Sequence, residues 1–349
     1  MSAQAGGLGG SQARDARIDA LKGVAIACVV LFHVMGQFWI TNPRAALIVR
    51  AFVSAFMLPL FAFLSGYVLS RPGGFHPRDY FVRRTLGLMV PYVVWELLYG
   101  AIFRHAAFAS VGAFGHYALQ VATDPHAEGR MWYLYVLWVC LILLGLARLR
   151  GDRTWMVLAS LPVALAVSFV PHFGAVAGVY PFAVLGLLVR RAEPALTPWL
   201  LRIAIGCGVA FVPLWLALRW HGLTARIRTP LDIAFAPRYA PGVYTLALLT
   251  ATAAVGALFA WSAWWRPVFV APLAIPGRLS FGIYVTHFLF IDGWHEPAAW
   301  LFPVMWVVAL AAGMALTLLL QQWRPSATLL LGERWRPRPS RPRHEEETL

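Results

Sequence analysis

Long apolar segments recur along almost the whole of this 349-residue chain, and they restrict its fold more than any other feature. About ten of them are near the length that a transmembrane helix needs, which is roughly 20 residues. Only 13% of the residues are charged, whereas a soluble domain carries about 25%. We therefore predict an all-α, polytopic integral membrane protein with about ten transmembrane helices in one bundle.

The hydropathy pattern also predicts the division of the chain. The predicted spans cover approximately residues 17–40, 46–70, 81–103, 131–149, 155–170, 175–189, 198–220, 243–264, 279–293 and 300–323. The membrane domain is thus predicted at 17–323, between disordered cytoplasmic tails at 1–16 and 324–349. The first part of the loop at 104–130 is apolar enough for a short interfacial or re-entrant helix.

The basic residues predict the orientation of the bundle. Most of the 29 lysines and arginines fall in the tails and in the loops that share their side, so the positive-inside rule places both termini in the cytoplasm. The formal charge of +14 lies between spans and does not indicate nucleic acid. The three cysteines lie in apolar runs, which predicts no disulfide or metal role for them.

The first span contains the strongest candidate site. Lys22, the only lysine, and His33 lie eleven residues apart, a step of roughly 1100° and ~16 Å that returns to the same helix face. Asp19 falls on nearly the same face. Lys22 alone is explained equally well as a snorkelling anchor, and the alternative for His33 is a polar group that serves only helix packing. Together, the ionisable groups predict a functional site, with His33 as a base or nucleophile.

Three further candidates lie in spans two and three. The Arg83–Arg84 pair is suited to a phosphate-rich ligand, although a positive-inside anchor explains it equally well. Ser65 precedes Gly66 in FLSGY, a pairing that more often serves close helix packing. Glu96 is a carboxylate within the third span, and it needs a partner for which His33 is one candidate.

Aromatic and histidine motifs mark spans four and nine. MWYLYVLW at 131–138 contains Trp132 and is also typical of an interfacial aromatic belt. SFGIYVTHF places Tyr284 and His287 three residues apart, on one helix face. No spacing typical of a metal site accompanies these histidines, so no metal is predicted.

Several of these motifs resemble, in order, those of the acyltransferase family three membrane proteins, particularly the branch similar to fucose 4-O-acetylases. The matching motifs are RIDALKG…H at 17–33, FLSGY at 63–67, FVRR…PYVVW at 81–95, MWYL at 131–134 and LSFGIYVTHF at 279–288. The resemblance implies transfer of an acyl group, most often acetyl, from cytoplasmic acyl-CoA to a hydroxyl. The acceptor would be a carbohydrate or a lipid-linked glycan of the cell envelope.

The resemblance also implies roles for single residues. His33 would be the general base or a transient acyl carrier, and Asp19 would orient Lys22. Arg83 and Arg84 would hold the CoA phosphates together with Lys22. Five other residues of the matching motifs would shape the site, namely Ser65, Tyr67, Trp132, Tyr284 and His287. Glu96 belongs to none of the matching motifs, and it is our own candidate for orienting His33. Acyl-CoA would be a co-substrate, with no further cofactor.

Two other classes of function stay open at this point. A transporter or proton-coupled channel would use histidine and glutamate as a relay, and it needs polar faces on several spans. Polar residues are dense only in the first span, which favours the enzyme. A non-catalytic acyl-binding sensor would bind the donor without turnover. The oligomeric state is not readable from the sequence.

Overall fold

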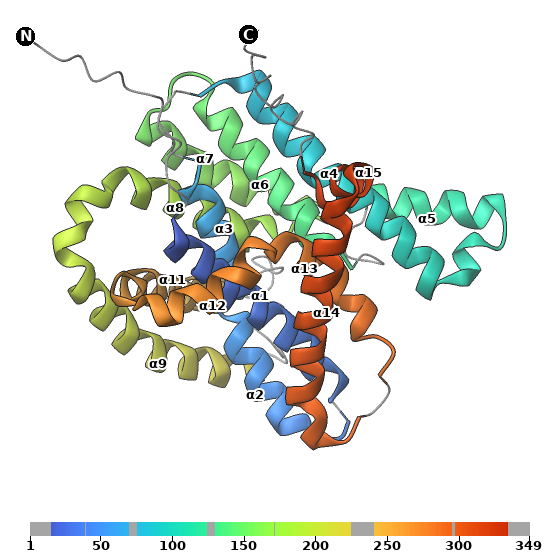
Figure 1. The fold of residues 1–349 in the computed structure, drawn as a ribbon. Helices are drawn as coiled ribbons and strands as arrows, with labels where there is room; N and C mark the ends of the chain where they lie inside the picture. The colour runs from blue at the N-terminus through green and yellow to red at the C-terminus, as the bar shows by residue number, and fades with distance from the viewer. Residues whose placement is uncertain are drawn as a thin grey trace, which may run out of the picture.

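The structure is a computed structural model that describes residues 15–38, 40–69, 75–123, 130–170, 172–224, 241–294 and 297–333. Within these ranges the chain forms α-helices and short 3₁₀ helices, with no strand, so the all-α prediction is confirmed there (Figure 1). The tails predicted at 1–16 and 324–349 lie mostly outside the described residues.

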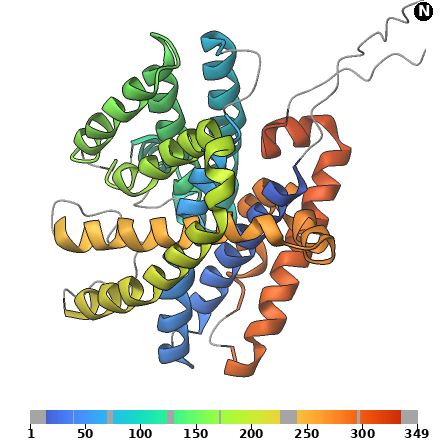
Figure 2. The ribbon, with the colours of Figure 1, turned by 90° about the vertical axis from the view of Figure 1, so that its left-hand side faces the viewer.

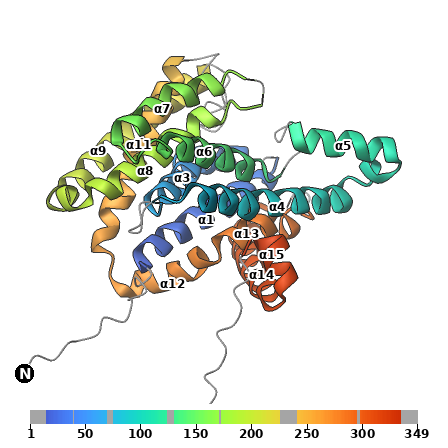
Figure 3. The ribbon, with the colours of Figure 1, turned by 90° about the horizontal axis from the view of Figure 1, so that it is seen from above.

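Helix α1 (Ala16–Gln37) runs through the middle of the bundle (Figures 1 and 3). Asp15 caps it by accepting a hydrogen bond from the amide of Arg17 at 2.9 Å. Helix α12 (Pro267–Arg278) crosses it where Gly23 meets Gly277. A side chain at either glycine would overlap the backbone of the other helix, so the two backbones lie in direct contact.

The second predicted span is a broken helix. It consists of α2 (Pro43–Ser54) and α3 (Met57–Tyr67), which together are apolar and long enough to cross a membrane. Helix α3 crosses α8 (Val176–Leu196) at Gly66 and Gly186, and a methyl group at either would overlap the other backbone. The close helix packing predicted for the glycine of FLSGY is therefore present.

The third span is α4 (Pro77–Phe103), and the loop after it contains α5 (Val111–Thr123). This loop helix, predicted from the apolar character of the segment, extends to one side of the bundle (Figure 1). Tyrosine hydroxyls join the two helices, because Tyr117 donates to the carbonyl of Glu96 at 2.8 Å and Tyr92 to that of Val121 at 2.6 Å.

The middle of the chain forms a curved set of helices. In order these are α6 (Trp132–Arg148), α7 (Thr154–Val167), α8, α9 (Leu200–Thr224) and α11 (Pro241–Trp261). Helices α8 and α9 follow each other through a short 3₁₀ turn and form a wide arc at the edge of the molecule (Figures 1 and 2). Helix α11 packs along α9.

The last part of the chain returns to α1. Helix α13 (Ser280–Thr286) continues into the 3₁₀ helix His287–Phe290, and this segment is bent by 53° relative to α12. Helix α14 (Phe302–Gln322) packs against α1 and α13. The prediction of a disordered tail from Arg324 is wrong at its start, because Arg324–Leu331 form helix α15, packed on α4 and α14.

The number of membrane spans is only partly supported. Among the described residues, six helices are long and apolar enough to cross a membrane, or up to seven if the bent pair is one span. Each predicted span contains a helix, but α6 and α7 are shorter, and α8–α9 count as one 45-residue element. At roughly 1.5 Å per residue, the length of that element is about twice the thickness of a hydrocarbon core, which is about 30 Å. Ten spans stay a prediction.

Contacts between helix ends agree with the predicted alternation of spans. At the start of α1, Arg17 Nη2 lies 3.4 Å from Oε1 of Glu193, a residue near the end of α8. Arg191, also near the end of α8, pairs with Asp152 in the connection between α6 and α7. All of these ends were predicted to share the side of the termini, while the assignment of that side to the cytoplasm stays a prediction.

Candidate functional site

A cavity of about 610 Å³ opens at the end of the bundle where α4 begins and α6 ends. It is lined by Arg83, Arg84 and Arg148, together with the rings of Tyr80 and Phe75. The Arg148 guanidinium lies 4.6 Å from the centre of the Phe75 ring, and that of Arg84 lies 5.7 Å from the Tyr80 ring. Arginines and aromatic rings therefore form much of the lining.

Arg83 and Arg148 of this cavity are paired with carboxylates. Arg83 pairs with Asp79 one turn earlier on α4. Arg148 is buried and forms two hydrogen bonds to Asp152, of 2.7 and 2.9 Å. Burial alone would raise the pKa of the Asp152 carboxyl, but the hydrogen bonds and charges of Arg148 and Arg191 lower it below its usual value.

A second cavity of about 220 Å³ adjoins the first, and the two share Arg84, Leu88 and Phe281 as lining residues. It reaches Lys22, Ser65 and Tyr284. The two cavities thus bring together five residues that the sequence predicted, from four separate helices, and these are Lys22, Ser65, Arg83, Arg84 and Tyr284.

The crossing of α1 and α12 positions Lys22. The Asp19 carboxylate, which is buried, lies 4.0 Å from Lys22 Nζ and 3.8 Å from Arg278 Nε. The predicted pairing of Asp19 with Lys22 is therefore present in the structure. Because Arg278 precedes α13 and lies beside the Gly277 contact, the same carboxylate joins the first helix to the segment that carries Tyr284 and His287.

His33 lies against His287, with ring centroids 5.1 Å apart. His287 is fully buried, whereas His33 is partly exposed. His287 Nδ1 lies 2.7 Å from the carbonyl oxygen of Tyr284, which can only accept, so Nδ1 carries the proton. Nε2 is then the unprotonated nitrogen, and it is buried without a hydrogen-bond partner among the described residues. Phe288 covers the His33 ring at 4.5 Å.

Tyr284 links this histidine pair to the cavities. It lines the smaller cavity, and its ring centroid lies 5.9 Å from that of His287 one turn later. The order along the site is therefore the arginine-lined cavity, then the Lys22 cavity, then Tyr284, and then the two imidazoles. We call this series the polar column, after the charged and polar side chains along it, which are Arg83, Arg84, Lys22, Tyr284, His33 and His287.

Glu96 does not orient His33 in this structure. Its Oε1 accepts a hydrogen bond from the backbone amide of Met131 at 2.6 Å, and its Oε2 is buried without a hydrogen-bond partner in the part of the chain that the structure describes. The prediction that Glu96 holds His33 is wrong for this reason. The carboxylate instead fixes the start of α6 beside Arg130, and His287 is the neighbour that the sequence did not name for His33.

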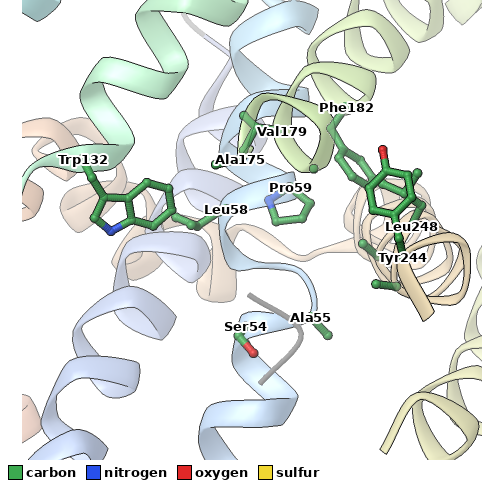
Figure 4. A pocket seen from close by; sticks show the side chains of 13 residues that line it. Ser54, Ala55, Leu58, Pro59, Trp132, Ala175, Val179, Phe182, Tyr244 and Leu248 are labelled. Atoms are coloured by element: carbon green, nitrogen blue, oxygen red, sulfur yellow. The ribbon is translucent and has the colours of Figure 1, made fainter. Parts of the chain in front are cut away.

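Two other predicted residues lie away from the column. The Tyr67 hydroxyl donates to Glu193 Oε1 at 2.6 Å and accepts from Arg190 at 3.2 Å, so it joins α3 to the end of α8. Trp132 lines a separate, largely apolar cavity of about 40 Å³ with Leu58, Phe182 and other residues (Figure 4). The next residue, Tyr133, lines the Lys22 cavity instead.

A charged pair that the sequence did not predict lies beyond the histidines. Arg130 forms an ion pair with Asp292, and both side chains are partly buried. The guanidinium lies 5.4 Å from the centre of the Phe288 ring, which also contacts the ring of His33. Burial lowers the pKa of Arg130. Only tertiary contact could reveal this pair, because each residue taken alone looks like a loop charge.

The fold defines a multi-pass helical membrane protein with a polar column through its bundle. The chain belongs to acyltransferase family three, since the family model, described as an acyltransferase domain, matches residues 15–321. It is similar to the nodulation protein NolL of Mesorhizobium japonicum, at 26% identity over 193 residues. That match covers 52% of this chain and 49% of NolL, so the chain spans about half the length of this relative. No solved structure matches it.

Proposed function

We propose that this protein is a membrane O-acyltransferase. It moves an acyl group, most often acetyl, from cytoplasmic acyl-CoA to a hydroxyl of a carbohydrate or lipid-linked glycan of the cell envelope, and it resides in the cytoplasmic membrane. The observation that carries this proposal is the polar column, in which two adjoining cavities lead from arginines to Tyr284, whose ring lies beside the His33–His287 pair. Membership of the acyltransferase family supports the reaction type.

The shapes and charges of the cavities support acyl-CoA as the donor. The larger cavity has arginines suited to phosphates, which bind guanidinium groups through paired hydrogen bonds. The smaller one is mostly lined by apolar and aromatic residues and suits the thin pantetheine arm. Lys22 and Arg84 lie along it, and Tyr284 marks its inner end near the histidines. The thioester would thus reach the imidazole pair from the side of the arginines.

In the proposed mechanism, His33 removes the proton of the acceptor hydroxyl as this oxygen attacks the thioester carbonyl. Collapse of the tetrahedral intermediate breaks the carbon–sulfur bond, and His33 returns the proton to the departing CoA thiolate. The free lone pair on His287 Nε2 can accept a hydrogen bond from the His33 imidazolium, which stabilises the charged intermediate. Direct attack of His33 on the thioester, which gives an acyl-histidine, uses the same geometry.

The acceptor would approach from the other side of the imidazoles. Arg130 and Asp292 lie there, separated from His33 by the Phe288 ring. A guanidinium and a carboxylate can donate to and accept from sugar hydroxyls, and the rings of Tyr99 and Phe103 beside Arg130 offer apolar faces. The two substrates would therefore meet at His33 from opposite sides.

The test compares His33→Ala with His116→Ala in proteoliposomes that are supplied with acetyl-CoA and a glycan acceptor. His116 is an exposed histidine on α5, far along the chain from the column, and serves as the matched control. We expect His33→Ala to insert and fold but to release no free CoA above background, and His116→Ala to act like wild type. Undiminished product from His33→Ala would refute the assignment.

The same preparation separates the alternatives. Acid-quenched wild-type protein that carries an acyl group on His33 would support the acyl-histidine route over the general base. Flux of a solute or of protons without an acyl donor would instead support a transporter. Donor binding without any CoA release would indicate a sensor.

A further inference from the structure

The helix that follows the last long span forms part of the wall of the larger cavity. Helix α15 begins at Arg324, beyond residue 321 where the family match ends. Its last residue, Leu331, and the next, Gly332, line the cavity together with Arg83 and Arg84. This wall therefore belongs to a part of the chain that the family comparison does not cover.

Specific contacts hold α15 in this position. The indole of Trp95 donates to the carbonyl of Leu330 at 2.9 Å, which fixes the end of α15 against α4. Gly332 has a φ of 62°, in the left-handed region that favours glycine. A side chain on Gly332 would overlap the backbone of Gly87 on α4, so the two chains are in direct contact. Gln321 also donates to Glu333 at 2.6 Å across the helix.

The chemistry of the cavity defines what this wall encloses. A volume of about 610 Å³ falls within the roughly 300–1,000 Å³ typical of small-molecule sites. Arg83 and Arg84 supply cations for phosphates, while Phe75 and Tyr80 supply aromatic rings that a planar base can contact. Phosphates combined with a planar base are the features of a nucleotide, and the apolar arm would leave it toward Lys22.

We propose that α15 is a specificity-determining wall, which shapes the larger cavity for the nucleotide end of a CoA thioester. The inference rests on the proposed acyl transfer, but it concerns a different property. Leu331 and Gly332 line one side of the cavity that holds the arginines, so a bound phosphate would be shielded from water on that side, and an ion pair with phosphate is stronger where less water surrounds it. Without this wall the acyl group and its arm would still reach the histidines, but the nucleotide would contribute little affinity.

The test uses two donors that carry the same acyl thioester. Acetyl-CoA has the nucleotide, and acetyl-pantetheine lacks it. The measured quantity is the KM for acetyl-pantetheine divided by that for acetyl-CoA. Because both constants come from one preparation, their ratio does not depend on the fraction of protein that is folded.

Two matched pairs of variants isolate α15. Leu331→Trp places a large ring at the buried cavity wall, while Leu329→Trp places it on the exposed side of the same helix. A chain that ends at Gln322 lacks α15 and the tail, while one that ends at Glu333 keeps α15 and lacks only the tail. In each pair the second variant is the control.

We expect wild type to prefer acetyl-CoA strongly. In Leu331→Trp and in the chain that ends at Gln322, the KM ratio should fall at least tenfold. In both controls it should stay as in wild type. An unchanged ratio in Leu331→Trp would overturn the role of α15. Equal KM values for the two donors in wild type would also overturn it, while acyl transfer would stand. Absence of turnover with either donor would instead refute the proposed function itself.

Discussion

The contact between Gly23 and Gly277 makes a quantitative prediction for Gly277→Ala. An added Cβ at Gly277 would lie 2.6 Å from the carbonyl carbon of Asp19 and closer still to its oxygen. Ordinary contacts of a Cβ begin at 3.4 Å, so α1 and α12 must part by at least about 0.8 Å. The obstacle is backbone, which cannot rotate away as a flexible side chain would.

This separation should affect stability and activity together. Overpacking of a close contact costs roughly 1–3 kcal/mol, which we expect as a loss in the free energy of unfolding. Asp19 pairs with both Lys22 and Arg278, so the movement also displaces Lys22 relative to the segment that carries His287. A misplacement of about 1 Å near reacting groups can reduce turnover by up to about a hundredfold. We therefore expect kcat/KM to fall by about tenfold to a hundredfold.

The control is the same substitution at Gly206 on α9, where an added Cβ would have no described atom within 4 Å beyond the adjacent residues and backbone of its own helix. Alanine is about 1 kcal/mol better than glycine within a helix, so Gly206→Ala should stabilise the protein slightly. Thermal unfolding in detergent and acetyl-CoA turnover measure both effects. If Gly277→Ala unfolds at the same temperature as wild type and keeps its activity, the glycine contact does not position the site as argued.

Two further predictions concern charged groups near the ends of the column. The lowered pKa of Asp152 means that its ion pairs stabilise the folded state above the unfolded pKa of the carboxyl, and that this stabilisation is lost as the pH falls through the lower, folded pKa. The difference in melting temperature between wild type and Asp152→Asn should therefore be full at pH 7 and shrink below about pH 4; a difference that is constant with pH would contradict this. Asp292→Asn leaves Arg130 without its partner, and a lost charged hydrogen bond costs roughly 1.5–3 kcal/mol. The KM for the glycan acceptor should rise about tenfold or more with no change in that for acetyl-CoA, and an equal rise in both would argue against an acceptor site at this end.

Much of the secondary structure could be predicted from the sequence, because a lipid environment requires long apolar helices. Helices lie in all the predicted spans, including α1 with Lys22 and His33 on one helix. The breaks were harder to find. The interruption between α2 and α3 falls at Ala55 and Phe56, where hydropathy continues without a change. Helix α15 was missed because an arginine- and proline-rich segment looked like a tail.

The sequence by itself determined the groups that share a helix face, since periodicity fixes those. It placed Asp19 beside Lys22 and identified the paired arginines of α4. The contacts between helices depend on where the helices cross and how each is rotated, which no local pattern specifies. Only the tertiary structure therefore gave His33 its neighbour His287, turned Glu96 toward the amide of Met131, and placed Tyr133 rather than Trp132 at the Lys22 cavity.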